Sequence, residues 1–285
     1  MSTKELNAVW KAVDEGNDTI SIKGVAPFLK QKDILNKIHV YSSLESTNKT
    51  AKEMALSAAE HGTVVIADYQ TAGKGRYGRT FYSPQSHGIY MSLILHPIKL
   101  SLSTPALVTH FAAVSVCEAI ESISDKKPQI KWVNDIFLNK KKICGILTEA
   151  ITDIKSGNIQ GMVVGIGINF STPTMGFPDD LRQIAGAVFE DGKPSITRNH
   201  LIGEIINRIL FLKNQYSNQE LLDKYRKRLM MLGENILVTG PNKSYEAIAI
   251  DIDDAGQLII KKDNDEVISL SSCEIRVRNR LPRKI

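Results

Sequence analysis

The pattern of the sequence changes at Gly233, and this change constrains the fold more than any other feature. Before Gly233, stretches with helical periodicity alternate with short β-branched runs. After it, short segments alternate with turn signals at residues 240–242, 253–256 and 263–265. Short strands at this spacing predict a small all-β unit of about five strands. We therefore expect an α/β domain of roughly 200 residues followed by a β-barrel of about 50.

The part before Gly233 is predicted to fold around a sheet. Residues 161–168 are apolar on both faces, which is typical of a central strand. Residues 105–123 predict a long, mostly apolar helix, and apolar residues on one face of residues 47–61 predict another. Further strands are expected over residues 63–68, 89–95, 130–133 and 143–150, and further helices over residues 4–13, 198–214 and 219–232.

The overall composition excludes several classes of protein. The chain has 285 residues, a formal net charge of +5 and three cysteines that lie far apart. An odd, dispersed set of cysteines indicates neither a disulfide framework nor a zinc site, and it is typical of a reducing cytosol. No run approaches about 18 uninterrupted apolar residues, so no membrane span is expected. The N-terminal residues lack the apolar core of a secretory signal. We therefore expect a cytoplasmic protein.

A glycine-rich segment, residues 69–79, reads Tyr-Gln-Thr-Ala-Gly-Lys-Gly-Arg-Tyr-Gly-Arg. Glycine lets a backbone approach a ligand closely and present N–H groups to an anion. Lysine and arginine among the glycines can meet phosphate or carboxylate. The segment has neither the Gly-Lys-Ser/Thr ending of a Walker loop nor the spacing of a dinucleotide-binding motif. Its composition alone fits a flexible basic surface loop as well as an anion-binding site.

This segment resembles the ATP- and biotin-binding loop of biotin protein ligases, which typically reads Gln-x-Ala-Gly-Arg-Gly-Arg-x-Gly-Arg. Lys74 replaces the first of those arginines. Residues 131–135, Lys-Trp-Val-Asn-Asp, resemble the family's Lys-Trp-Pro-Asn-Asp. Four further segments resemble the family in the same order along the chain: Ser46-Thr47-Asn48 and residues 142–149, 165–169 and 271–275. The resemblance spans residues 38–283.

Each short segment also has a purely structural explanation. Ser46, Thr47 and Asn48 can cap a helix. Lys131 can be a surface lysine next to a buried Trp132, and the glycines within residues 165–169 can serve tight packing. Because the segments occur in the family's order, we favour the functional interpretation.

The resemblance implies the architecture in more detail. A mixed central sheet of the class II aminoacyl-tRNA synthetase type is expected in a catalytic domain over residues 38–232, followed by an SH3-like β-barrel over residues 233–285. Residues 1–37 are expected to be the remnant of a winged helix. Within them, residues 8–13 resemble the end of a recognition helix and residues 20–25 part of the wing. Because the two supporting helices are missing, we expect no specific DNA binding.

The resemblance also assigns two overlapping sets of site residues. Those expected to bind biotin are Ser46, Thr47, Asn48, Gln70, Lys74, Gly75, Arg76, Lys131 and Gly145. Those expected to bind ATP or the adenylate are Arg76, Arg79, Phe81, Lys131, Asn134 and Asn169. Lys131 and Arg76 are expected to be catalytic, because cations stabilise charge that develops at the reacting groups. The sequence identifies no metal ligands.

The implied reaction has two steps. Biotin and ATP form biotinyl-5'-AMP, and biotin is then transferred to a specific lysine of a biotin carboxyl carrier protein domain, as in acetyl-CoA or pyruvate carboxylase. Mg²⁺ is expected to accompany the triphosphate. Residues 71–86 are expected to close over the adenylate and exclude water. A homodimer is also considered, with residues 89–95 beside its interface.

Two alternative functions remain open at this point. One is a lipoate or octanoyl transferase of the same broad fold, against which the match at residues 73–79 argues. The other is a biotin-responsive DNA-binding repressor.

Overall fold

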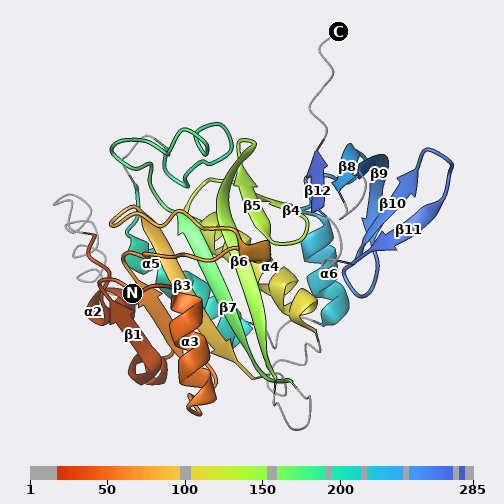
Figure 1. Cartoon of the computed structure of the whole chain (residues 1–285). Helices are drawn as coiled ribbons and strands as arrows, with labels where there is room; N and C mark the ends of the chain where they lie inside the picture. Colours follow the sequence, from red (N-terminus) through yellow and green to blue (C-terminus); the bar gives the residue numbers. More distant parts are fainter. Residues whose placement is uncertain are drawn as a thin grey trace.

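The computed structural model describes residues 18–96, 104–152, 159–190, 194–212, 217–239, 244–271 and 276–279. These residues form two sheets (Figure 1). The first sheet has seven strands in the order β1-β2-β3-β7-β6-β5-β4. β1 and β2 are parallel and every other neighbouring pair is antiparallel, so the predicted mixed sheet is confirmed. The strands are β1 (Ile38–Tyr41), β2 (Val64–Ala67), β3 (Gly88–Leu95), β4 (Gln129–Lys131), β5 (Asp135–Leu138), β6 (Lys141–Thr152) and β7 (Ile159–Asn169).

The two longest strands, β6 and β7, pair with each other at the centre of the sheet. Successive side chains on a strand point to opposite faces. Ile166 of β7 belongs to the main core on one face, whereas Val163 belongs to a smaller core on the other face. Gly145 of β6 lies opposite Gly167 of β7, and the alternation places both glycines on the face of Val163. The two strands therefore contribute no side chain at this pair of positions.

Helices cover both faces of this sheet (Figure 1). α3 (Thr47–Leu56) packs through Ala51 on the face of Val163. α4 (Pro105–Ile123) and α5 (Arg198–Asn207) cover the opposite face and supply much of the main core. α6 (Asn218–Arg226) packs beside α4. The result is a three-layer arrangement, and within the described part of the chain α3 is the one helix that covers the glycine-bearing face, together with loops.

α4 is the core helix of the domain. By length and composition it could cross a membrane, but 72% of its apolar window is buried inside the protein. Thr104 caps the helix by accepting a hydrogen bond from the backbone N–H of Leu107 at 3.3 Å, and Pro105 occupies the first turn. The helix predicted over residues 105–123 is thus confirmed at both ends.

The second sheet is formed by the C-terminal part of the chain. Its strands run in the order β11-β10-β9-β8-β12, and all neighbours are antiparallel. The predicted all-β unit of five strands is therefore confirmed as an antiparallel sheet. The strands are β8 (Asn235–Thr239), β9 (Ser244–Ile252), β10 (Leu258–Lys262), β11 (Val267–Leu270) and β12 (Arg276–Asn279).

The turn between β9 and β10 joins the second sheet to the first domain. Its Gly256 carbonyl accepts a hydrogen bond from Trp132 Nε1 at 3.0 Å. Gly256 also packs against the His110 ring of α4, which lies 4.2 Å from the Tyr225 ring between centroids. Burial lowers the pKa of His110 to about 3, so this ring is neutral at physiological pH.

Some predicted boundaries were wrong. The helix predicted over residues 47–61 ends at Leu56, and Ala58 beyond it has a left-handed φ of 64°. The helix predicted over residues 198–214 changes at Asn207 into a π-helical turn, Arg208–Leu212. The helix predicted over residues 219–232 spans Asn218–Arg226. β1 was not predicted, because four residues are too few to show a clear period.

The N-terminal prediction was wrong where the structure describes it. Residues expected to form part of a wing instead form the short helix α2 (Ile22–Val25). The Ser21 hydroxyl caps it by accepting a hydrogen bond from the Gly24 N–H at 3.0 Å. The recognition-helix prediction falls on residues 8–13, outside the described residues. The same holds for residues 272–275 of the predicted C-terminal segment.

The burial of β3 argues against one part of the dimer prediction. All eight of its residues are buried, and the strand lies between β2 and β7. Its side chains therefore offer no surface for the dimer contact predicted beside residues 89–95.

We predict that Gly256→Ala destabilises the protein more than Gly176→Ala does. Both glycines have left-handed φ values, 75° and 74°. A Cβ at Gly256 would lie 2.1 Å from His110 Cε1, whereas a Cβ at Gly176 would meet nothing within 4 Å. The strained φ lowers the free energy of unfolding of each variant by about 1–2 kcal/mol. Overpacking lowers that of Gly256→Ala by about 1–3 kcal/mol more. Urea unfolding measures both, and equal free energies of unfolding would contradict the assigned contact.

Candidate active site

A cavity lies on the glycine-bearing face of the sheet. The start of α3, the β2–β3 connection (residues 68–87), β6, β7 and residues 131–135 surround it. Twelve of the thirteen residues that were predicted to bind a ligand line this cavity. They are Ser46, Thr47, Asn48, Gln70, Lys74, Gly75, Arg76, Arg79, Phe81, Lys131, Asn134 and Gly145.

The remaining predicted residue, Asn169, does not line the cavity. It ends β7, and its side-chain amide donates a hydrogen bond to the Gly186 carbonyl at 2.9 Å. The structure therefore gives Asn169 a partner within the protein, and the prediction that it lies beside the adenine is not supported by its position.

One end of the cavity is built from uncharged hydrogen-bonding groups. The backbone N–H of Thr47 donates to Gln70 Oε1 at 2.8 Å, and the Thr47 hydroxyl donates to the same oxygen at 3.2 Å. The Gln70 amide in turn donates to Ser83 Oγ at 2.9 Å. Because its two ends are held, Gln70 is fixed in one orientation beside the start of α3. These contacts make a preorganised polar site rather than a flexible one.

Asn48 is fixed even more completely. Its side-chain nitrogen donates to the Leu147 carbonyl at 3.2 Å and to Glu149 Oε2 at 2.9 Å. Its side-chain oxygen accepts a hydrogen bond from Ser92 Oγ at 2.7 Å, and Ser92 also lies 2.8 Å from the Thr47 hydroxyl. Both amide hydrogens of Asn48 are thus used within the protein. Only the side-chain oxygen of Asn48 could accept a further hydrogen bond from a ligand.

Glycines form the floor of the cavity, where a Cβ would crowd the neighbouring side chains. A Cβ at Gly165 would lie 2.0 Å from Asn48 Oδ1, and a Cβ at Gly167 would lie 2.7 Å from the Phe81 ring. At Gly145, on the neighbouring strand, a Cβ would lie 3.3 Å from the same ring. The Phe81 ring therefore rests on bare backbone of β6 and β7.

The glycine-rich segment folds as a hairpin over the cavity. The Gly75 N–H donates to the Arg79 carbonyl at 2.7 Å, and the Phe81 N–H donates to the Gly73 carbonyl at 2.8 Å. Tyr77 and Gly78 at its tip have φ values of 58° and 72°. Two successive left-handed residues make the tight turn that joins antiparallel strands. The interpretation as a flexible surface loop is therefore not supported.

This hairpin brings Arg76 to the far wall of the cavity. Arg76 Nη1 donates to Asn134 Oδ1 at 3.1 Å, and the Asn134 amide donates to the Ile146 carbonyl at 2.8 Å. Lys131 ends β4 beside them, with its ammonium 5.8 Å from the centroid of the Phe137 ring. The predicted pair, Arg76 and Lys131, thus lines the same cavity.

The backbone behind Lys131 is held from two sides. Tyr225 of α6 donates its hydroxyl to the Val133 carbonyl at 2.8 Å, and Trp132 bonds to Gly256 of the second sheet. Burial raises the pKa of Tyr225, so its hydroxyl keeps its proton and remains a donor. The peptide between Trp132 and Val133 is cis.

The lining is strongly positive. Its charged residues are five cations, Lys74, Arg76, Arg79, Lys131 and Lys142, and one carboxylate, Asp135. Asp135 is paired with Lys142, whose Nζ lies 2.7 Å from its Oδ1. An uncharged polar end and a cationic end in one cavity are suited to a ligand with a neutral polar head next to anionic groups.

Sequence reasoning missed several residues of this site. Ser92, which links Thr47 to Asn48, is completely buried. Ser92 and Tyr90 carry the only hydroxyl groups in the otherwise apolar strand Gly88–Leu95. A serine within such a strand is a sequence signal that could have marked Ser92 as a candidate site residue. Gly165 and Gly167 were noted as part of a motif but not as lining residues.

Two comparisons of the sequence with known proteins identify its relatives. Residues 40–169 match the Biotin/lipoate A/B protein ligase family, and residues 231–278 match the Biotin protein ligase C terminal domain. The Bifunctional ligase/repressor BirA of Bacillus subtilis is 35% identical over 242 residues, which cover 82% of this chain and 72% of that protein. The Biotin--[acetyl-CoA-carboxylase] ligase of Mycobacterium tuberculosis is 26% identical, with 85% of this chain and 90% of that protein covered.

A solved structure has the same fold. The biotin protein ligase from Aquifex aeolicus in complex with biotin and ATP superimposes with a TM-score of 0.71 and 23% sequence identity, covering 85% of this chain and 99% of that chain. The mixed sheet, the second antiparallel sheet and the relatives together define an enzyme of the ligase class. The chain belongs to the biotin protein ligase family.

Proposed function

We propose that the cavity binds biotin and ATP and that the enzyme attaches biotin to a lysine of a biotin carboxyl carrier protein domain. The observation that carries this proposal is the uncharged cluster of Thr47, Asn48 and Gln70 next to five cations in one cavity. The ureido ring of biotin offers one carbonyl acceptor and two N–H donors, which neutral groups can satisfy. The biotin carboxylate and the triphosphate need positive charge.

The proposed roles follow the two ends of the cavity. Ser46, Thr47, Asn48 and Gln70 receive the ureido ring, and Gly145, next to the Phe81 ring, lines the same cavity. Arg76, Arg79, Phe81 and Asn134 receive the nucleotide, and Lys74, Gly75, Arg76 and Lys131 lie where the carboxylate meets the α-phosphate. Asn169 is left out because of its position.

The proposed reaction joins the two ligands before the transfer. A carboxylate oxygen of biotin attacks the α-phosphorus of ATP, the bond to the β-phosphate oxygen breaks, and biotinyl-5'-AMP and pyrophosphate form. The unprotonated amine of the acceptor lysine then attacks the acyl carbon, AMP leaves, and the nitrogen loses a proton as the amide forms. Lys131 and Arg76 stabilise the negative charge on the phosphate oxygens in the first step.

Mg²⁺ is proposed to arrive with ATP rather than to occupy a resident site. Among the described residues, no group of three or more His, Cys, Asp or Glu could hold a metal ion. The single carboxylate of the lining, Asp135, is paired with Lys142. Mg²⁺ usually keeps several waters and binds substrate phosphates together with only one or two carboxylates. The triphosphate would therefore be its principal ligand here.

The finer points of the architecture and setting are also proposals. We assign residues 38–232 to a catalytic domain of the class II aminoacyl-tRNA synthetase type and residues 233–285 to an SH3-like barrel. The hairpin at residues 74–80 supports a closing role for residues 71–86, because it already lies over the cavity. Two buried free thiols, Cys117 and Cys144, support a cytoplasmic setting. Homodimerisation stays a prediction.

The names of some relatives raise DNA binding as a second function. The Bacillus relatives are named bifunctional ligase/repressors. We propose that this chain lacks sequence-specific DNA binding, because the segment expected to form a wing is the helix α2, which packs on α5. Sequence-selective binding that persists at high salt in a gel shift would contradict this proposal.

The central prediction is that the protein labels a biotin carrier domain. Incubated with ATP, labelled biotin and that domain, it should transfer the label to one lysine by an amide bond. Labelled lipoate, offered in parallel, should not be transferred, because it lacks a ureido ring for the polar end of the cavity. Mass spectrometry of the acceptor measures both. Equal transfer of lipoate would favour the lipoate alternative.

Lys131→Ala should lower the rate of biotin-dependent pyrophosphate release by about 100-fold or more, since it removes a cation at the reacting phosphate. Lys126→Ala is the matched control, because it removes a lysine that lies over the Phe189 ring, outside the cavity lining. It should release pyrophosphate like the wild type. A Lys131→Ala rate equal to that of the control would contradict the role of Lys131.

Gly165→Ala should weaken biotin binding by about tenfold or more, since an overpacked Asn48 must move and every 1.4 kcal/mol is tenfold in affinity. Gly161→Ala is the control on the same face of β7, because its Cβ would lie 3.4 Å from Ile151, an ordinary contact. Isothermal titration with biotin measures both. If the two variants bound biotin equally well, the assignment of the polar end of the cavity to biotin would be wrong.

A further inference from the structure

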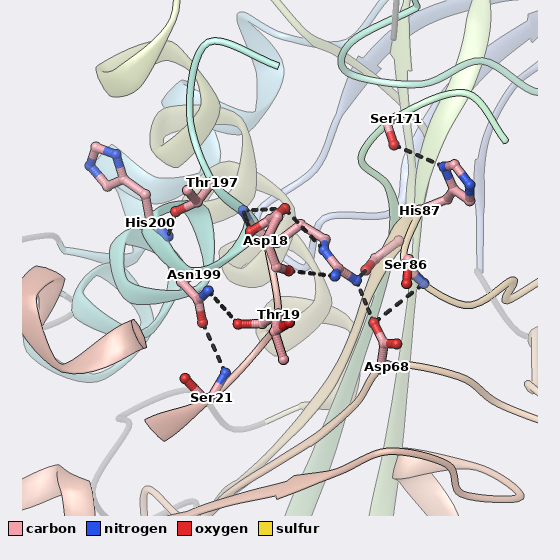
Figure 2. Close-up of polar contacts among 12 residues, drawn as sticks. Asp18, Thr19, Ser21, Asp68, Ser86, His87, Ser171, Thr197, Asn199 and His200 are labelled. Atoms are coloured by element: carbon pink, nitrogen blue, oxygen red, sulfur yellow. Dashed lines mark hydrogen bonds and ion pairs between the residues drawn. The ribbon is translucent and has the colours of Figure 1, made fainter. Parts of the chain in front are cut away.

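A buried arginine outside the cavity connects segments that lie far apart in the sequence. Arg198 begins α5 and is 2% exposed. Its Nε lies 3.1 Å from Asp18 Oδ2, and its Nη2 donates to the Asp18 carbonyl at 2.6 Å. Its Nη1 donates to Asp68 Oδ1 at 2.6 Å and to the Gly88 carbonyl at 3.2 Å. Figure 2 shows Asp18 and Asp68 on opposite sides of this contact.

Two of these partners mark the two ends of the β2–β3 connection. Asp68 directly follows β2 and lies two residues before Gln70, which belongs to the cavity. Gly88 is the first residue of β3. One guanidinium nitrogen thus holds both ends of the segment that carries Gln70, the hairpin and Phe81.

Further bonds hold these two ends in place. The Ser86 N–H donates to Asp68 Oδ1 at 3.3 Å (Figure 2). The His87 carbonyl accepts from the N–H groups of Phe170 and Ser171, both at 3.0 Å. The base of the connection is therefore fixed, whereas its hairpin extends over the cavity.

The chemistry of the contact explains why an arginine stands here. Arginine presents several donors in a rigid plane, so it can bind two carboxylates and two carbonyls at once. A lysine has one nitrogen and could not span them. Because Asp18 and Asp68 both face the guanidinium, its charge is compensated although it is buried. Arg198 does not line the cavity, so it cannot act on a ligand directly.

We propose that Arg198 is a positioning residue for the β2–β3 connection. Through Asp68 and Gly88 it fixes the base of this segment, and this sets the hairpin over the bound adenylate. The proposal rests on the proposed function for the nature of the ligand. Without the contact, the connection would sample more conformations, and closing it over the ligand would cost more entropy.

The test compares two partners of the same guanidinium. Asp68→Ala removes the carboxylate on the side of the connection, and Asp18→Ala removes the one on the other side. Both variants should lose thermal stability, because each leaves a buried arginine with one carboxylate. Only Asp68→Ala should release biotinyl-5'-AMP faster, by about tenfold, the equivalent of one charged hydrogen bond. Its KM for ATP should rise while the KM of Asp18→Ala stays at the wild-type value.

A conservative variant and a second readout complete the experiment. Asp68→Asn keeps an oxygen that can accept from Arg198 and from Ser86, so it should restore most of the retention. Limited trypsin digestion at Lys74, Arg76 and Arg79 needs no ligand, and Asp68→Ala should be cut faster than Asp18→Ala. Equal release and equal digestion of the two alanine variants would overturn the proposal. A wild type that forms no biotinyl-5'-AMP would instead reject the proposed function, and the digestion would still decide the role of Arg198.

Discussion

The antiparallel pairing of β6 with β7 is the constraint on which the cavity depends. Its register places Gly145 opposite Gly167 and sends Ile146, Ile166 and Ile168 toward the main core. A slip of one residue would reverse the two faces of a strand. The isoleucines would then fill the cavity, and glycines would leave gaps against α4. The same alternation that builds the core therefore also keeps the opposite face bare for a ligand.

Much of this arrangement could be predicted from the sequence because its signals are local. Pro105 after a capping threonine fixes the start of α4, and its apolar run fixes the end. Turn residues separate the short strands after Gly233. The uncharged and cationic site residues came from a resemblance of short motifs, and the fold then brought all of them but Asn169 to one cavity. The position of Asn169 was not predicted, because its side chain bonds to Gly186. Gly186 lies in a loop, and a loop has no periodic sequence pattern from which this contact could be expected.

What could not be predicted depends on contacts between distant segments. The composition of residues 69–79 fits a surface loop as well as a binding site, and only the pairing of Gly73 with Phe81 and of Gly75 with Arg79 decides between them. Arg198 is a further example, since nothing near it in the sequence indicates that it meets Asp18 and Asp68, which are 180 and 130 residues away. Buried polar residues of this kind are selected by three-dimensional neighbours, not by local propensity.

The contact of Trp132 with Gly256 has a consequence for how the two sheets can be recombined. The C-terminal sheet is not an interchangeable module, because its β9–β10 turn is packed against α4 and bonded to the residue next to Lys131. A chimaera that takes this sheet from a relative must also carry a turn whose glycine fits over His110. Because Arg226 of α6 also bonds to Asp251 and to the Ile252 carbonyl of β9, such a chimaera must match this strand as well as the turn.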